Sequence, residues 1–335
     1  MSSFWQKSAA GYLLKSTVRL VLVIAAVSVI SFVLVSESPI DPIKAYVGEV
    51  GLANMNEETY AKFQAYFGTD IPPVKRYLNW AHDFIRGDMG QSLLYRQPVT
   101  GVIKEKFANS MALMALAWVF SGIVAFVLGV LAGVFKNSAL DKIIKNYALV
   151  LASAPTFWLA LIALMVFSVW LRIFPIGFSV PLGVAAADVT VWDSLYHLAL
   201  PALTLSLTGI ASITLHTREK VIDVMGEDYI LYARARGQRL WPMVTGHVIR
   251  NVTLPAITLQ FASISEIFGG SVLVEQVFSF PGLGQAAVRA GIGGDAPLLL
   301  GIAIISAALV FGGNLLANLL YGLIDPKIRR QGRAS

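Results

Sequence analysis

Residues 226–255 read GEDYILYARARGQRLWPMVTGHVIRNVTLP, a polar, arginine-rich stretch between two long apolar blocks. Six Lys and Arg side chains lie from Arg218 to Arg250. Two neighbouring helices need only a few residues to connect, so a polar stretch of this length indicates a folded loop. We expect the loop to dock onto another protein.

The composition around this loop is typical of a membrane protein. The 335 residues are 56% hydrophobic and only 14% charged, whereas soluble domains average about 25% charged residues. A block of about 20 apolar residues can cross a bilayer. A continuous block does so as a helix, because an unpaired backbone N–H or C=O group is costly in lipid and a helix pairs these groups within the segment. Six blocks are long enough: residues 18–36, 110–135, 147–171, 197–215, 252–274 and 297–324.

These blocks predict an all-α, polytopic membrane protein with six transmembrane helices. The first block is long and no clear cleavage site follows it, so we expect a retained helix and not a signal peptide. Residues 1–17 are either an interfacial amphipathic lead or the start of the first span. The rest divides into an extracytoplasmic cap, a core with five spans and a cytoplasmic loop at 216–250, and a basic tail: residues 37–108, 109–324 and 325–335.

The distribution of Lys and Arg predicts the orientation. Cytoplasmic loops carry an excess of these residues, and with the N-terminus inside they gather at the N-terminal lead, in the second and fourth loops and in the tail. The loop at 173–196 has no Lys or Arg, and the loop at 276–296 has only Arg289. Both termini are therefore expected in the cytoplasm. The net charge of +6 follows from this topology and does not indicate nucleic-acid binding, because the charge is split among separate loops.

Local signals refine the cap and the spans. Helices are expected at 56–67 and 74–86, followed by a turn at 87–90, which makes a small folded cap that is not an independent domain. Pro155 is expected to kink or start a helix in the third span. Gly129 and Gly133 have the spacing of a close helix–helix contact.

Several kinds of chemistry are missing from the sequence. There is no cysteine and no GxxxxGK[ST] phosphate loop, the four histidines are scattered, and no Ser/His/Asp set stands out. We therefore expect no metal site, no cofactor held by this chain and no enzymatic activity. A membrane-embedded enzyme would need a convergent catalytic set, and a secondary transporter would show inverted repeats; neither pattern is visible.

Two acidic residues lie in or beside the fifth span. Carboxylates are costly in hydrocarbon and so are functional candidates by default. Glu266 lies deeper, where a pathway-facing role and a structural pairing are both open; Glu275 stands at the outer end, where a helix-end hydrogen bond is favoured. Their spacing of nine residues puts them on roughly opposite faces of a helix.

The loop contains a predicted short helix at 227–236. Glu227 and Asp228 stand at its start and Arg234 and Arg236 at its end, an order that suits the helix dipole. Gly237 is a natural residue for the helix to end at. The charges and the glycine therefore bound the helix from both sides.

The faces of this helix suggest what it contacts. Tyr229 and Tyr232 are three residues apart and are expected to share a face that fits a groove on a partner. Ala233 and Ala235 are small and would let a partner surface approach closely. A helix lying on lipid headgroups is the alternative, and the mixed acidic and basic charge favours docking.

At these residues the sequence resembles a known family. EDYILYARARG (227–237), followed by HVIRN and LP, resembles the EAA loop of ATP-binding-cassette (ABC) importer permeases, in the extended form of the dipeptide/oligopeptide/nickel branch. The resemblance covers nearly the whole chain. Further pieces match in order: GDMGQSLLYRQPV, PTFWLA, EQVFSFPGLG and YGLIDPKIRR. Two departures are Arg236, where the family has a lysine, and Ile40-Asp41-Pro42, where it has a GDP triplet.

The resemblance implies the type I ABC importer permease fold and a coupling helix that docks into a cytoplasmic ATPase. Residues implied to couple to the ATPase are Glu227, Asp228, Tyr229, Ala233, Arg234, Ala235, Arg236 and Gly237. Residues implied to brace the loop against the spans are His247, Arg250 and Asn251.

The resemblance also implies the partners and the location. They are a homologous second permease in a heterodimer, two ABC ATPases that hold ATP and Mg²⁺, an extracytoplasmic substrate-binding protein and the bilayer of the bacterial inner membrane. The substrate is a di- or oligopeptide, nickel or a metal chelate. SEIFGG, which contains Glu266, and PTFWLA tilt the expectation slightly toward nickel or a chelate.

Overall fold

The computed structural model describes residues 2–37, 41–67, 71–181, 183–184 and 188–324. The regular elements in these residues are helices, with one isolated bridge between Gln91 and Pro98. The all-α prediction is confirmed. The chain forms two compact units, residues 1–109 with 282–311, and residues 110–281 with the chain from residue 312. The domain division predicted from the sequence differs, because it ended the cap at residue 108 and assigned residues 282–311 to the core. The basic tail at 325–335 lies outside the described residues.

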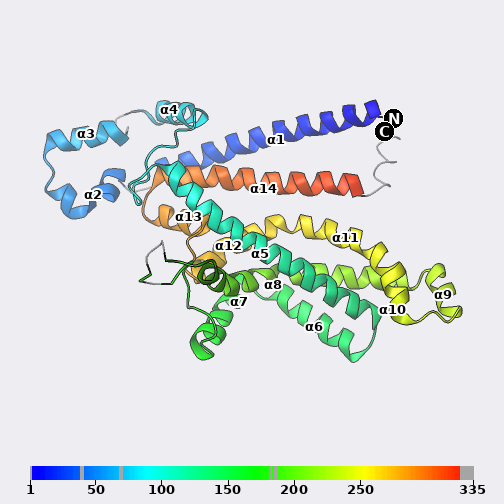
Figure 1. Ribbon diagram of the computed structural model, residues 1–335. Coiled ribbons are helices and arrows are strands. Elements are labelled where there is room, and N and C mark those ends of the chain that lie inside the picture. The colour runs from blue at the N-terminus through cyan, green and yellow to red at the C-terminus, as the bar shows by residue number, and fades with distance from the viewer. Residues whose placement is uncertain (1, 38–40, 68–70, 182, 185–187, 325–335) are drawn as a thin grey trace. The chain divides into compact units, whose positions relative to one another are not determined.

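Within the described residues, four helices contain an unbroken stretch long and apolar enough to cross a membrane, and the count reaches six if two bent helix pairs are each one span. The unbroken four, shown in Figure 1, are α1 (Ser2–Ser36), α5 (Val99–Val134), α8 (Val191–Met225) and α14 (Ala296–Ile324). The six expected spans therefore correspond to four straight helices and two broken ones.

The third expected span, 147–171, is not a single helix. α6 (Ala139–Ser153) ends before Pro155, and α7 (Thr156–Ala163) with the π-helical η1 (Leu164–Trp170) leaves at 109° to it. Pro155 lacks a backbone N–H and disfavours helical geometry in the residue before it, and it takes the N-cap position of α7. The predicted effect of Pro155, to kink or start a helix in this span, is confirmed.

The fifth expected span, 252–274, is also broken. α11 (Ile249–Ala262) and α12 (Ile264–Val277) meet at Ser263 with a bend of 47° between the two halves of the candidate span. The Ser263 hydroxyl donates to the backbone oxygen of Gln260 at 2.8 Å. A side-chain bond of this kind back onto the preceding turn is a known cause of helix bending.

Two other boundaries differ from expectation. α1 runs from Ser2 to Ser36 without a break, and its candidate span is Leu14–Ser36; the role of residues 1–17 as a separate lead stays a prediction. α8 begins at Val191, several residues before the expected position 197, because Thr190 and Asp193 form a capping box. The backbone N–H of Thr190 donates to Asp193, and the backbone N–H of Asp193 donates to the Thr190 hydroxyl.

The first unit carries the cap. The expected helices are confirmed as α3 (Glu57–Phe67) and α4 (Pro73–Ile85). Two more, α2 (Pro42–Ala53) and α13 (Leu283–Ile292), were not predicted. α2 starts with Pro42 at its first position, after Asp41 accepts a hydrogen bond from the backbone N–H of Ile43 at 2.8 Å.

A buried carboxylate holds this unit together. Asp295, fully buried before α14, accepts hydrogen bonds from the Ser92 hydroxyl at 2.5 Å and the backbone N–H of Leu94 at 3.0 Å. It also accepts from the backbone N–H of Leu298 at 3.2 Å. The GDMGQSLLYRQPV stretch therefore serves as a structural joint between residues more than two hundred apart in sequence.

The second unit is built around α8. α6, α7, α11 and α12 all pack against it, and its buried residues include Leu200, Leu205 and Ile210. Gly129 and Gly133 on α5 let α8 approach: a Cβ on Gly133 would lie 2.5 Å from the Cβ of Val221. The predicted packing role of these glycines is confirmed. After α8 the loop forms the short helices α9 (Asp228–Ala235) and α10 (Leu240–Met243) and the π-helical η2 (Val244–Val248).

Candidate functional site

α9 is a two-turn helix whose two ends are set by its sequence. Asp228 lies in its first turn and Arg234 in its last. Gly237 follows in the left-handed region at φ 77°, and its N–H donates to the oxygen of Arg234 at 2.9 Å. The N–H of Gln238 donates to the oxygen of Ala233 at 3.1 Å, which completes a Schellman motif. The predicted helix and its glycine stop are confirmed.

One buried side chain anchors α9. Ile230 is fully buried, and it is the only residue of α9 classed as buried. Ala233 packs half-buried at the edge of the same cluster. The cluster draws on the end of α8, on the segments after the loop and on α5: Val130, Val221, Val224, Met243, Val244, Val248 and Val252.

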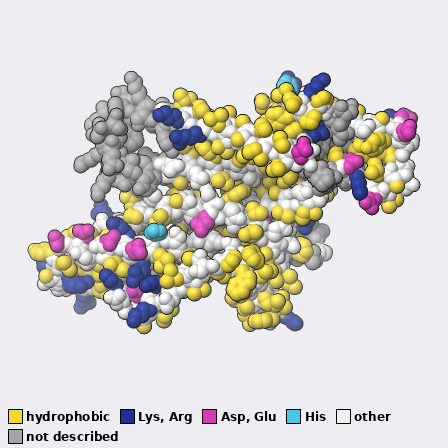
Figure 2. All heavy atoms as spheres, turned by 180° about the vertical axis from the view of Figure 1, so that it is seen from behind, with side chains coloured by type: hydrophobic (Ala, Val, Ile, Leu, Met, Phe, Trp, Pro, Cys, Tyr) yellow, Lys and Arg dark blue, Asp and Glu magenta, His cyan; other side chains and the backbone are white. Residues whose placement is uncertain are grey.

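The rest of α9 faces outward. Leu231 and Tyr232 are 48% and 64% exposed, and Arg236 places its guanidinium 5.8 Å from the ring centre of Tyr232. Figure 2 shows charged side chains gathered at the end of this unit that carries the loop. Exposed residues among those predicted to couple are Glu227, Asp228, Tyr229, Arg234, Ala235, Arg236 and Gly237. Ala233 differs, because its small side chain serves packing within the chain.

Tyr229 is engaged by its own chain. Its hydroxyl accepts a hydrogen bond from the Asn251 amide at 3.1 Å, and its ring meets that of His247 at 6.4 Å between centroids and an interplanar angle of 65°. Tyr229 is still 45% exposed and Tyr232 is 64% exposed; that the two rings together contact a partner stays a prediction. His247 and Asn251 therefore both contact α9, while their role in bracing the loop stays a prediction.

Arg250 behaves differently from its two neighbours. It is exposed, and in the described part of the chain it has no hydrogen-bond or ion-pair partner. His247 and Asn251 are four residues apart, share a helix face and both contact Tyr229. The structure thus brings together Tyr229, His247 and Asn251 and leaves Arg250 free for an external contact.

A buried ion pair lies beneath the loop. Asp141, in the first turn of α6, is 2% exposed and accepts two hydrogen bonds from Arg218 on α8, at 2.5 and 2.7 Å. Asp141 also accepts from the backbone N–H of Asn137 at 2.8 Å. This bidentate geometry fixes the position of the α6 start relative to the last turns of α8.

Sequence reasoning missed both the ion pair and the anchor. In the sequence, Arg218 contributed only to the positive charge that predicts a cytoplasmic loop. Its partner Asp141 lies 77 residues away, so no local pattern linked the two residues. Ile230 carried a usable signal, because it is an aliphatic side chain within a polar, charged helix. Trp241, whose ring meets Phe135 at 6.2 Å, was likewise not identified.

The two pathway candidates lie in different environments. Glu275 is fully buried and accepts a hydrogen bond from the Ser110 hydroxyl on α5 at 2.6 Å. Glu266 is exposed in the first turn of α12, where a carboxylate suits the helix dipole. Their expected placement on different faces agrees with this geometry; their roles stay predictions. Across the residues that the structure describes, no group of three His, Cys, Asp or Glu is placed to hold a metal ion.

Comparison with known proteins identifies the family. Residues 125–330 match the family described as binding-protein-dependent transport system inner membrane component. The chain belongs to this family. Two relatives cover nearly its whole length: the oligopeptide transport system permease protein AppB of Bacillus subtilis (strain 168) and the dipeptide transport system permease protein DppB of Escherichia coli (strain K12).

The likeness to these permeases extends over most of each chain. AppB is 32% identical over 320 residues, which are 95% of this chain and 99% of AppB. DppB is 31% identical over 323 residues, with 91% and 94% covered. This permease is therefore a polytopic ABC importer permease with the type I fold, as the motifs predicted. The matched region, residues 125–330, contains α9, Ile230, His247 and Asn251.

Proposed function

We propose that this permease imports di- or oligopeptides as one of two membrane subunits of an ATP-driven importer. The support for a peptide substrate is the naming of its relatives as oligopeptide and dipeptide permeases. The sequence-based preference for nickel or a metal chelate has no such support, and nickel uptake is therefore measured as the alternative in the substrate experiment below. An external binding protein delivers the peptide.

The partners follow from the same proposal. A homologous second permease completes the translocation path, and two cytoplasmic ATPases bind ATP and Mg²⁺ and hydrolyse the ATP. The permease lies in the bacterial inner membrane with both termini in the cytoplasm, so that α9 meets the ATPases. The permease itself catalyses no reaction.

The observation that carries the coupling role is the attachment of α9. A helix held by one buried side chain, with its charged and aromatic residues exposed, suits insertion into a cleft of another protein. Ile230 and the contact between Tyr229 and Asn251 connect α9 to the buried cluster at the ends of α8 and α11. Movement of the ATPases is passed to the spans through these contacts, which biases a bundle with two stable arrangements.

Within the spans, we assign the pathway role to Glu266. An exposed carboxylate in an apolar span faces water or a partner subunit at much lower cost than it faces lipid, and a peptide offers an ammonium group for it to pair with. Glu275 would act as a positioning residue, since its buried carboxylate already accepts from Ser110. Replacing Glu266 by Gln should then lower peptide uptake and leave assembly with the ATPases intact.

The coupling role is tested by changing α9 alone. The double variant R234E/R236E reverses the charge on its exposed end, and Gly237→Pro removes its stop because proline holds φ near −65° where this backbone has 77°. Both should abolish peptide uptake and reduce ATPase co-purification while membrane insertion is kept. Lys142→Glu, an exposed charge reversal on α6, is the matched control and should transport normally. Full uptake with normal ATPase recovery in the α9 variants would refute the proposal.

The substrate class is tested separately. Uptake of a radiolabelled dipeptide and of radiolabelled nickel is measured in cells that lack the chromosomal copy and carry either this chain or an empty vector. Peptide uptake restored by this chain supports the proposal, whereas restored nickel uptake alone would overturn the peptide assignment. Co-purification of ATPases also separates an importer permease from a secondary transporter or a membrane-embedded enzyme.

A further inference from the structure

α4 has an apolar stripe that the described residues of its unit leave exposed. Val74, Leu78 and Ile85 are 73%, 60% and 85% exposed. With about 100° of rotation per residue, these three side chains fall within a narrow arc of the helix, and Ala81 lies beside them. A contiguous exposed apolar surface of this kind marks an interaction site.

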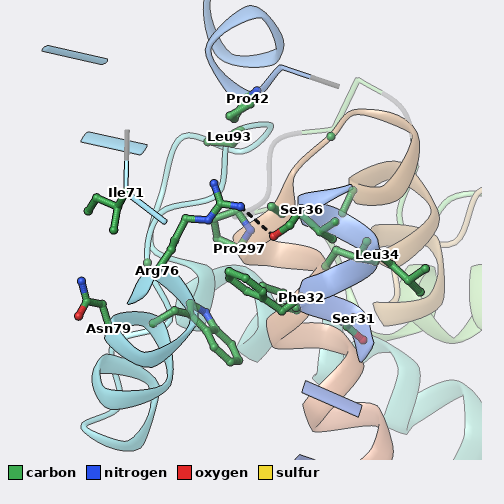
Figure 3. A pocket seen from close by; sticks show the side chains of 18 of the residues that line it. Ser31, Phe32, Leu34, Ser36, Pro42, Ile71, Arg76, Asn79, Leu93 and Pro297 are labelled. Atoms are coloured by element: carbon green, nitrogen blue, oxygen red, sulfur yellow. Dashed lines mark hydrogen bonds between the residues drawn. The ribbon is translucent and has the colours of Figure 1, made fainter. Parts of the chain in front are cut away.

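The neighbouring arc of α4 is covered by α1. Tyr77 meets Phe32 edge to face at 5.2 Å between ring centroids, and its hydroxyl lies 2.9 Å from the hydroxyl of Ser28. Arg76 donates to the Ser36 hydroxyl at 2.8 Å and lies over the ring of Phe32, as Figure 3 shows. α4 is thereby fixed against the last turns of α1.

These contacts set the depth of α4 relative to a membrane. Ser28 and Ser36 are eight residues apart, or about 12 Å along the helix at 1.5 Å per residue, and both belong to the candidate span Leu14–Ser36. On the same stretch of α1, Ile30 and Val33 are 58% and 51% exposed, as lipid-facing side chains would be. The uncovered stripe of α4 therefore lies beside a part of α1 that is itself within or at the edge of the bilayer.

The charged residues of α4 complete the pattern. Lys75, His82 and Arg86 are exposed and border the apolar stripe on one side, while Asp83 lies on the opposite face of the helix. The polar side of α4 lines a cavity of about 950 Å³, with Arg76, Asn79, Trp80 and Asp83 among its walls. An apolar stripe flanked by basic residues is typical of a helix that lies in the membrane interface.

We propose that α4 is an interfacial anchor whose apolar stripe is buried in lipid and whose basic border contacts lipid phosphates. A helix of this type sits about 5–10 Å into the boundary between headgroups and acyl chains, which matches its attachment to the end of the α1 span. Lys75 and Arg86 extend their charged ends toward the headgroups, and their stems cover apolar surface. The anchor fixes the cap at the membrane surface.

The absence of cysteine from the sequence makes a direct test practical. Single variants Leu78→Cys and Ile85→Cys, with the matched control Asp83→Cys, are labelled with a nitroxide and reconstituted in liposomes of phosphatidylethanolamine and phosphatidylglycerol. The labels at 78 and 85 should collide more often with oxygen than with a water-soluble nickel chelate, and the label at 83 should show the reverse. Equal chelate access at all three sites would overturn the proposal.

Two further measurements separate lipid from a protein partner. Adding a purified substrate-binding protein should leave the labels at 78 and 85 unchanged; protection that requires this protein would show that the stripe docks a protein. The label at 78 is also measured in the double variant Lys75→Glu/Arg86→Glu. This variant should bring the label closer to the membrane surface, and the change should be larger in phosphatidylglycerol vesicles than in pure phosphatidylcholine vesicles. An equal change in depth, variant against wild type, in both vesicle types would refute the role of the basic border.

Discussion

Replacing Ile230 by Ala should release α9 from the permease while the spans stay folded. The Ile230 side chain is fully buried, and the substitution removes three carbon atoms, each worth about 0.8 kcal/mol of transfer free energy. The loss is therefore about 2.4 kcal/mol before the cavity is counted, and measured substitutions of this type fall at about 2–5 kcal/mol. Ile230→Val should cost only about 0.5–1.5 kcal/mol.

The loss is expected to be local because α9 cannot persist without its anchor. α9 has eight residues, and an isolated helix shorter than about 12–15 residues is marginal in water. Apart from the edge contact of Ala233, its remaining described attachment is the hydrogen bond and ring contact of Tyr229. A loss of about 2.4 kcal/mol corresponds to about fifty-fold more frequent opening of α9.

Hydrogen exchange of the purified permease in nanodiscs measures this opening directly. The amides of α9 should exchange about fifty-fold faster in Ile230→Ala, with the amides in the middle of α8 unchanged, and peptide uptake should fall in cells. Leu231→Ala, at a neighbouring position that is 48% exposed, is the control and should leave exchange nearly unchanged. Wild-type exchange rates in Ile230→Ala, or an equal acceleration in Leu231→Ala, would refute the reasoning.

Two predictions concern the helices beneath the loop. Arg218→Ala leaves the buried carboxylate of Asp141 unpaired and should destabilise the detergent-purified protein by about 3–5 kcal/mol, seen as a lower melting temperature; an unchanged melting curve would contradict it. Gly133→Ala forces a methyl group against Val221 and should cost about 1–3 kcal/mol, whereas Gly101→Ala on the same helix meets no atom within 4 Å and should not lower the melting temperature.

α9 was predictable because its signals are local. The charges at both ends of the helix and Gly237 all lie within residues 227–237, and they predicted the bounds of the helix nearly to the residue. The φ of 77° at Gly237 explains why a glycine occupies that position. What the sequence did not reveal was which side of the helix faces inward. That depends on Ile230 belonging to one buried cluster with Val221 and Val248, residues that only the fold brings together.

The spans were found from their hydropathy, but their breaks were less visible. The break at Pro155 can be predicted from the sequence, because proline restricts the backbone and lacks an N–H donor wherever it occurs. The bend at Ser263 has no such mark, since serine is tolerated in helices and bends them only when its hydroxyl bonds to the preceding turn. α13 was missed because LGQAAVRAGI is short and flanked by glycines, and its stability comes from burial of Leu283, Ala286 and Ala290 against residues far away in sequence.

The length of α8 and the shortness of its link to α9 have a mechanical consequence. α8 has 35 residues, about 52 Å at 1.5 Å per residue, and only Gly226 and Glu227 separate its last residue from the first residue of α9. So short a link leaves little slack to absorb a displacement. If α8 pivots as a rigid rod about its far end, a tilt of about 5° moves the α9 end by about 4.5 Å, close to the rise of one helical turn. α8 then works as a lever arm: a small change in its angle and a large linear displacement of α9 are the same motion.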